Sequence, residues 1–110
     1  MITYNLTLED MPNRDKKLSK IAKVENFKST RSGLPIANQF IITLQNGIEV
    51  FQSYNSIICV KANNETYLDQ NRWNYSRTTS RYRNKFLNET TVETVKKIGF
   101  GNYTMVDLNK

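Results

Sequence analysis

Residues 70–85 combine cationic side chains with aromatic rings and include no acidic residue. The cations are Arg72, Arg77, Arg81, Arg83 and Lys85, and the rings are Trp73, Tyr75 and Tyr82. Guanidinium groups bind phosphate oxygens and flat rings stack on unpaired bases, so this mixture is typical of a surface that binds nucleic acid. The alternative is a helix that buries its rings and leaves its cations in solvent. For Trp73 and Tyr75, which precede the helix, both interpretations stay open.

The whole chain carries 16 Lys and Arg residues against 10 Asp and Glu residues, which gives a formal net charge of +6. The run 70–85 supplies five of these cations. A second basic group lies nearer the N-terminus and consists of Lys16, Lys17, Lys20 and Lys23. Both groups predict a polyanionic partner, namely RNA, DNA or a nucleoprotein complex.

The residue types that carry most enzyme chemistry are missing or isolated. The chain has no histidine and a single cysteine, and its sequence contains no glycine-rich phosphate loop. Its acidic residues form no Asp-x-Asp pair that could hold a metal ion. We therefore expect no enzymatic activity, no bound metal and no cofactor. Cys59 lies in an apolar run and is expected to be a small buried residue.

Helical spacing separates the cations of this run from most of its rings. At about 100° per residue, Arg77, Arg81 and Lys85 fall on one stripe of a helix. Tyr82 and Phe86 point broadly away from that stripe, so we expect them in the core. The sequence thus predicts a helix with an aromatic inner face and a basic outer face.

Arg83 does not fit this division, because it projects between Phe86 and Leu87. A cation on the inner face of a helix needs a partner for its charge. Three nearby carboxylates are candidates, namely Asp69, Glu89 and Glu93.

The composition of the segments before this helix predicts strands. Runs rich in β-branched and aromatic residues occupy residues 39–44, 48–54, 56–61 and 66–68. Asn46-Gly47 separates the first two and is a strong hairpin signal. We expect one α+β domain over residues 1–110, built as an antiparallel β-meander of about four to six strands with one or two C-terminal helices.

The N-terminal part is less regular. Residues 1–8 alternate in polarity as a strand does, whereas residues 14–31 are basic and fit either a short helix or a strand. We treat residues 1–24 as an extension of a core that spans residues 25–108.

Capping signals mark both C-terminal helices. Thr78 or Thr79 can cap the first, and Thr90 with Glu93 forms a capping box for the second. Gly99 is expected to end the second helix, and residues 103–108 form a final strand. The apolar stripe of the second helix is expected to comprise Val92, Val95 and Ile98.

The sequence shows no signal peptide and no apolar run near the roughly 20 residues that span a bilayer. Cys59 has no second cysteine with which to form an intrachain disulfide. We therefore expect a cytoplasmic protein in a reducing compartment that does not associate with membranes.

Residues 73–79, Trp73-Asn-Tyr75-Ser-Arg-Thr78-Thr79, form a Trp-x-Tyr-Ser-x-Thr-Thr signature. With this specific signature, residues 25–108 resemble a family of small uncharacterised proteins carried by phages and plasmids of low-GC Gram-positive bacteria. The resemblance implies an accessory protein of a mobile element and assigns no activity or functional residue. Such proteins often act against host defences, so the resemblance favours an anti-defence or host-takeover role of the anti-CRISPR kind.

Together these observations predict a non-enzymatic protein that binds nucleic acid or a nucleoprotein effector. The binding residues are expected to be Arg72, Trp73, Tyr75, Arg77, Arg81 and Lys85, with Lys16, Lys17, Lys20 and Lys23 as a second patch. One alternative is a protein-binding inhibitor of a host enzyme, such as a defence protein, with Trp73, Tyr75 and nearby arginines at the interface. Another is a small DNA-binding transcriptional regulator.

Overall fold

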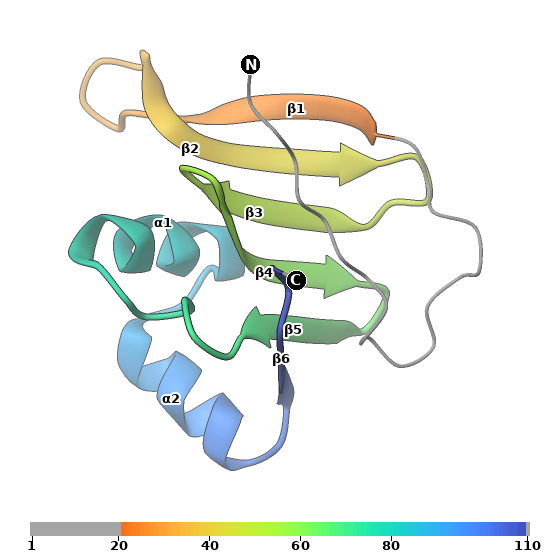
Figure 1. The fold of residues 1–110 in the computed structure, drawn as a ribbon. Coiled ribbons are helices and arrows are strands. Elements are labelled where there is room, and N and C mark those ends of the chain that lie inside the picture. The colour runs from red at the N-terminus through yellow and green to blue at the C-terminus, as the bar shows by residue number, and fades with distance from the viewer. Residues whose placement is uncertain (1–20, 110) are drawn as a thin grey trace.

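A computed structural model of the protein describes residues 21–109 (Figure 1). The strands are β1 (Ile21–Lys28), β2 (Pro35–Leu44), β3 (Glu49–Ser53), β4 (Ser56–Ala62), β5 (Glu65–Asp69) and β6 (Tyr103–Val106). The helices α1 (Arg77–Leu87) and α2 (Thr91–Gly99) lie between β5 and β6 in the sequence. The predicted α+β fold, with a strand meander followed by two helices, is confirmed.

All six strands form one sheet in the order β1-β2-β3-β4-β5-β6. The first five are antiparallel neighbours, as a meander requires. β6 instead runs parallel to β5, with Tyr67 opposite Thr104 and Leu68 opposite Met105. The parallel direction follows from the connection, because α1 and α2 carry the chain back before it enters β6.

The predicted turn at Asn46-Gly47 joins β2 to β3. Gly47 has a φ of 88°, and its N–H donates to Leu44 O over 3.0 Å. Asn46 Oδ1 accepts from the N–H of Ile48 over 3.2 Å, which is the local side-chain bond that suits asparagine to turns.

β1 resolves the open choice between helix and strand in the basic segment. Ile21–Lys28 is a strand that pairs with β2 along its length, and two register shifts interrupt the pairing. The strand predicted at residues 1–8 and the start of the basic segment lie outside the described residues.

Two apolar clusters pack on the sheet, because the central strands are buried on both faces. One contains Phe51, Cys59 and Leu68 together with Tyr82 and Phe86 of α1. This cluster confirms that α1 places its rings in the core and that Cys59 is buried. The other cluster consists of Ile42, Leu44, Val50, Ile57, Val60, Tyr67 and Leu108.

α2 differs from its prediction in the face that it buries. Ile98 packs partly against the core, but Val92 and Val95 are 65% and 52% exposed, and the buried residue of the helix is Thr94. The helix ends at Gly99 as expected, although the left-handed residue that follows is Gly101, with a φ of 77°. The apolar stripe predicted for α2 is therefore wrong for two of its three residues.

Candidate nucleic-acid interface

The basic helix α1 begins two or three residues earlier than its predicted caps would place it. Ser76 is the N-cap, and its Oγ accepts from the N–H of Thr79 over 3.1 Å. Thr79 itself is fully buried and shares a 2.9 Å hydrogen bond with Ser53 of β3. The prediction of Thr78 or Thr79 as the cap is wrong, because Thr79 holds the helix to the sheet instead.

Arg77, Arg81 and Lys85 lie on α1 as the helical spacing predicts, and all three are exposed. Between residues 21 and 109 no carboxylate forms an ion pair with any of them. Lys85 Nζ lies 5.1 Å from the centre of the Tyr82 ring, a cation–π contact that leaves its charge uncompensated. We call these three residues the basic stripe.

An open groove lies beside the basic stripe, at the start of α1. Its lining consists of residues 74–77 together with Ser80, Arg81 and Asn84. Tyr75 is 49% exposed, so its ring is accessible from this groove. The groove therefore brings together two arginines, one ring and several neutral hydrogen-bonding groups.

Arg72 and Trp73 are held away from the basic stripe. Arg72 is half-buried, and its Nη1 lies 3.8 Å from a carboxylate oxygen of Asp69. Trp73 is also half-buried and packs against the cluster that contains Phe51. Of the two rings whose role was open, Tyr75 is therefore the accessible one and Trp73 belongs to the edge of the core.

Arg83 is fully buried, but its partners are not the predicted carboxylates. Its Nη1 donates to Trp73 O over 2.6 Å and to Asn74 Oδ1 over 3.0 Å. Its Nη2 donates to Asn84 Oδ1 over 2.9 Å and to Thr91 Oγ1 over 2.8 Å. These neutral oxygens accept from the two Nη groups of the guanidinium, which can only donate. Nε is buried and makes no hydrogen bond within residues 21–109.

The buried position of Arg83 also changes its acidity. Burial lowers the pKa of Arg83, and the negative charge of Glu89 opposes that shift in part. Arg83 Cζ lies 5.1 Å from the centre of the Trp73 ring. Arg83 thus ties the segment before α1 to both helices and places a poorly compensated positive charge beneath the groove.

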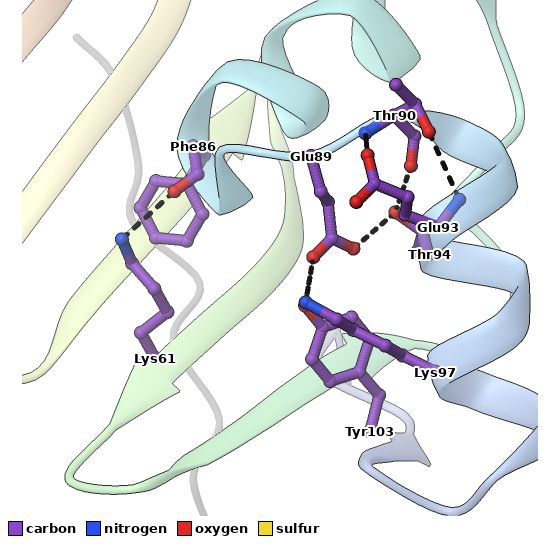
Figure 2. A network of polar contacts seen from close by, with 8 residues as sticks. All are labelled: Lys61, Phe86, Glu89, Thr90, Glu93, Thr94, Lys97 and Tyr103. Carbon is purple, nitrogen blue, oxygen red and sulfur yellow. Dashed lines mark hydrogen bonds and ion pairs between the residues drawn. The ribbon is translucent and has the colours of Figure 1, made fainter.

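Glu89, one of the three carboxylates that the sequence proposed for Arg83, has another role. Glu89 joins α2 to β6: its oxygens accept from Lys97 Nζ over 2.7 Å, from Thr94 Oγ1 over 2.5 Å and from Tyr103 Oη over 2.6 Å (Figure 2). Burial raises the pKa of Glu89, but these three hydrogen bonds outweigh burial and hold its pKa below the ordinary value. Burial and the bond to Glu89 raise the pKa of Tyr103 to about 12.

The second predicted basic patch is only partly within the described residues. Lys23 lies exposed on β1, where its Nζ forms a 2.9 Å ion pair with Glu25. Lys16, Lys17 and Lys20 lie outside the described residues.

Sequence reasoning missed the neutral members of the groove, namely Asn74, Ser76, Ser80 and Asn84. A signal for two of them was present, because Ser80 and Asn84 have the same helical spacing as Arg77 and Arg81. Asn74 lies before the helix, so no periodicity could have indicated it.

Over residues 21–109, no group of three or more histidine, cysteine or acidic side chains could hold a metal ion. In the same part of the chain, none of the helices is long and apolar enough to cross a membrane.

Residues 22–102 match the model of a family of unknown function, DUF8033. The match covers most of the chain, so this protein belongs to that family. No curated protein and no solved structure shows a significant match to the chain.

Proposed function

We propose that this member of DUF8033 is a non-enzymatic protein that binds the phosphate backbone of RNA or DNA, free or within a nucleoprotein complex, through its basic stripe. The observation that carries the proposal is the exposure of Arg77, Arg81 and Lys85 on one helix face without a carboxylate partner within residues 21–109. A row of solvated cations can contact successive phosphates of a polyanion, and this binding releases the counterions that the phosphates held.

The biological setting that we propose comes from the resemblance to proteins of phages and plasmids. In that setting the protein acts in the bacterial cytoplasm as an accessory factor against host defence. Some inhibitors of host defence mimic DNA with an acidic surface, and a basic stripe does not fit that design. An inhibitor that binds a nucleoprotein effector, whose nucleic acid displays a negatively charged backbone, fits the basic stripe better.

The test compares two variants with the same change in charge. In the first, the basic stripe is reversed by Arg77→Glu, Arg81→Glu and Lys85→Glu. In the second, three exposed cations elsewhere are reversed by Lys28→Glu, Arg31→Glu and Lys96→Glu. Each reversal removes two units of charge, so both variants have a formal net charge of zero instead of +6.

Fluorescence anisotropy with single-stranded and double-stranded RNA and DNA measures the affinity of each variant over a range of salt concentrations. Three phosphate contacts predict a slope of log K against log salt of about −2.7 on duplex DNA and about −2 on single strands. Binding should be lost in the stripe variant and largely kept in the control. Equal losses in both variants would show that only net charge matters and would exclude an interface at the basic stripe.

One observation favours a second function, inhibition of a host enzyme by direct protein contact. α2 and the residue after it expose Val92, Val95 and Phe100, the last at 81%. All three come from one stretch of nine residues, and an exposed apolar patch is typical of protein interfaces. Under this alternative, capture of one host protein survives nuclease treatment and is lost in Phe100→Asp, whereas reversal of the basic stripe leaves it unchanged.

The third alternative, a DNA-reading regulator, gains no support from α2. A recognition helix inserts its N-terminal turn into the major groove. In α2 that turn contains Glu93, whose carboxylate accepts from the N–H of Thr90 over 3.0 Å while Thr90 Oγ1 accepts from the N–H of Glu93 (Figure 2). The capping box thus places a negative charge where a base edge would lie.

A further inference from the structure

The groove beside the basic stripe contains more than cations, and its neutral groups are held in fixed positions. Asn74 Oδ1 accepts from Arg83 Nη1 over 3.0 Å and from Ser80 Oγ over 2.7 Å. Because a guanidinium can only donate, the oxygen of the Asn74 amide must face Arg83. The NH₂ group of Asn74 then points away from Arg83, and it makes no hydrogen bond to any other residue in the range 21–109.

An accessible ring and two guanidinium groups border the same groove. Tyr75 is the ring, at 49% exposure, and Arg77 and Arg81 line the groove with it. The groove is open to solvent and has a volume of about 750 Å³.

These groups match the parts of a nucleotide. A ring stacks on a base, guanidinium groups bind a phosphate, and an amide NH₂ can donate to a base carbonyl or a phosphate oxygen. A base paired in a duplex is stacked between its neighbours and cannot offer its flat face to Tyr75, so the chemistry favours an unpaired base.

We infer that this groove holds one unpaired nucleotide of single-stranded RNA or DNA, with its base stacked on Tyr75 and its phosphate bound by Arg77 and Arg81. The inference rests on the proposed function and adds to it a preference for single strands and a contact to a base. Asn74 acts as a donor to the nucleotide, and Arg83 acts from beneath as a positioning residue that orients Asn74.

The first experiment separates the base contact from the backbone contact. Two labelled oligonucleotides of about 12 nucleotides, within the common site size for single strands, carry the same number of phosphates. One is oligo(dT), with oligo(rU) measured in parallel, and the other has abasic linkages throughout. Their affinities are measured by anisotropy for the wild type, Tyr75→Ala, Tyr75→Phe and Phe100→Ala.

The wild type should bind oligo(dT) about tenfold more tightly than the abasic strand, the scale of one stacked base. Tyr75→Ala should reduce oligo(dT) affinity to the abasic level and leave the abasic affinity unchanged. Tyr75→Phe keeps the ring and should bind like the wild type, as should Phe100→Ala, which removes an exposed ring outside the groove.

A second variant tests the role of Asn74, because the change should weaken nucleotide binding without lowering the stability of the fold. Asn74→Asp places a carboxylate against the buried guanidinium of Arg83 and removes the free NH₂ donor. The urea midpoint should therefore be equal or higher, while oligo(dT) binding weakens. Because the new carboxylate also repels phosphate, binding to both strands should fall, and a role for the Asn74 NH₂ group requires a larger loss on oligo(dT) than on the abasic strand. Equal losses on the two strands would exclude that role.

The outcomes distinguish the two proposals. Equal, salt-sensitive affinity for both strands, unchanged by Tyr75→Ala, would overturn the nucleotide site and leave backbone binding by the basic stripe intact. Absence of binding to either strand at low salt would overturn both. A tighter complex with duplex DNA than with oligo(dT) would also contradict the nucleotide site.

Discussion

The two helices of this protein have opposite relations to the core. α1 buries Tyr82 and Phe86, at 7% and 5% exposure, and turns its cations outward. α2 buries Thr94 and turns Val92 and Val95 outward. Both are amphipathic, yet only α1 follows the rule that the apolar face of a helix packs inward.

The neighbour of each helix explains the difference. α1 lies against β3 and β4, whose Phe51 and Cys59 present an apolar surface. α2 lies beside β6, and the space between them holds the carboxylate of Glu89. A buried carboxylate requires donors, so the inner face of α2 carries Thr94 and Lys97 rather than its valines. A helix that packs on a buried charge can thus reverse the usual polarity.

The largest expected effect tests the inner face of α1. Phe86→Ala should lower the free energy of unfolding by about 3–5 kcal/mol, because it opens a cavity in a packed cluster. Val95→Ala on α2 removes a side chain that is 52% exposed and should change stability by no more than about 0.5 kcal/mol. Urea denaturation measures both, and comparable losses would contradict the opposite orientation of the two helices.

The next effect tests the charge beneath α2. Glu89→Gln keeps the shape of the side chain but removes the charge that accepts from Lys97, Thr94 and Tyr103, so we expect a loss of about 2 kcal/mol at pH 7. Thermal and urea denaturation measure this loss. A variant as stable as the wild type would show that the carboxylate does not hold α2 in place.

The same carboxylate predicts a pH dependence. Because folding lowers the pKa of Glu89 below its ordinary value of 4.5, the unfolded chain binds the proton more readily. The stability that Glu89 contributes is complete above pH 4.5 and is lost as the pH falls through the lower pKa of the folded state. Urea midpoints measured from pH 7 to pH 3 should therefore fall less steeply in Glu89→Gln than in the wild type.

A smaller effect tests the link from Glu89 to the sheet. Tyr103→Phe removes one hydroxyl and its 2.6 Å bond to Glu89, so we expect a loss of about 1 kcal/mol. Tyr54→Phe is the matched control, because Tyr54 is an exposed tyrosine whose hydroxyl makes no hydrogen bond to another described residue. Equal effects of the two changes in urea denaturation would assign no special role to the Tyr103 hydroxyl.

The smallest expected effect concerns the outer face of α2. Val92→Thr combined with Val95→Thr keeps the β-branched shape and should change stability by less than about 0.5 kcal/mol. Lower stability would mean that these valines pack inward in solution. Unchanged stability with reduced capture of a protein partner would instead support the second proposed function.

Local signals in the sequence were enough to predict much of the fold. The Asn46-Gly47 turn, the capping box at Thr90 and the β-branched and aromatic runs of the central strands are each signals that lie within a few residues, and the structure confirms them. The basic stripe was equally predictable from the sequence, because its spacing depends only on helix geometry.

Features that depend on distant contacts were not predictable. The parallel pairing of β6 follows from the path of two helices, and the inverted face of α2 follows from Glu89. Apart from the adjacent Asn84, the neutral partners of Arg83 come from the segment before α1 and from the start of α2. The sequence pointed to carboxylates instead, because a buried cation was expected to need an opposite charge. The orientation of Asn74 depends on that same contact.

The parallel pairing of β5 and β6 has a consequence for the nascent chain. Each strand from β2 to β5 can pair with the strand made just before it, so this part of the sheet can form during synthesis. β5 gains its outer neighbour only after both helices have been made. Until then its free edge can pair with other chains. A chain that has left the ribosome with both helices still undocked therefore exposes this edge to aggregation or to capture by a chaperone.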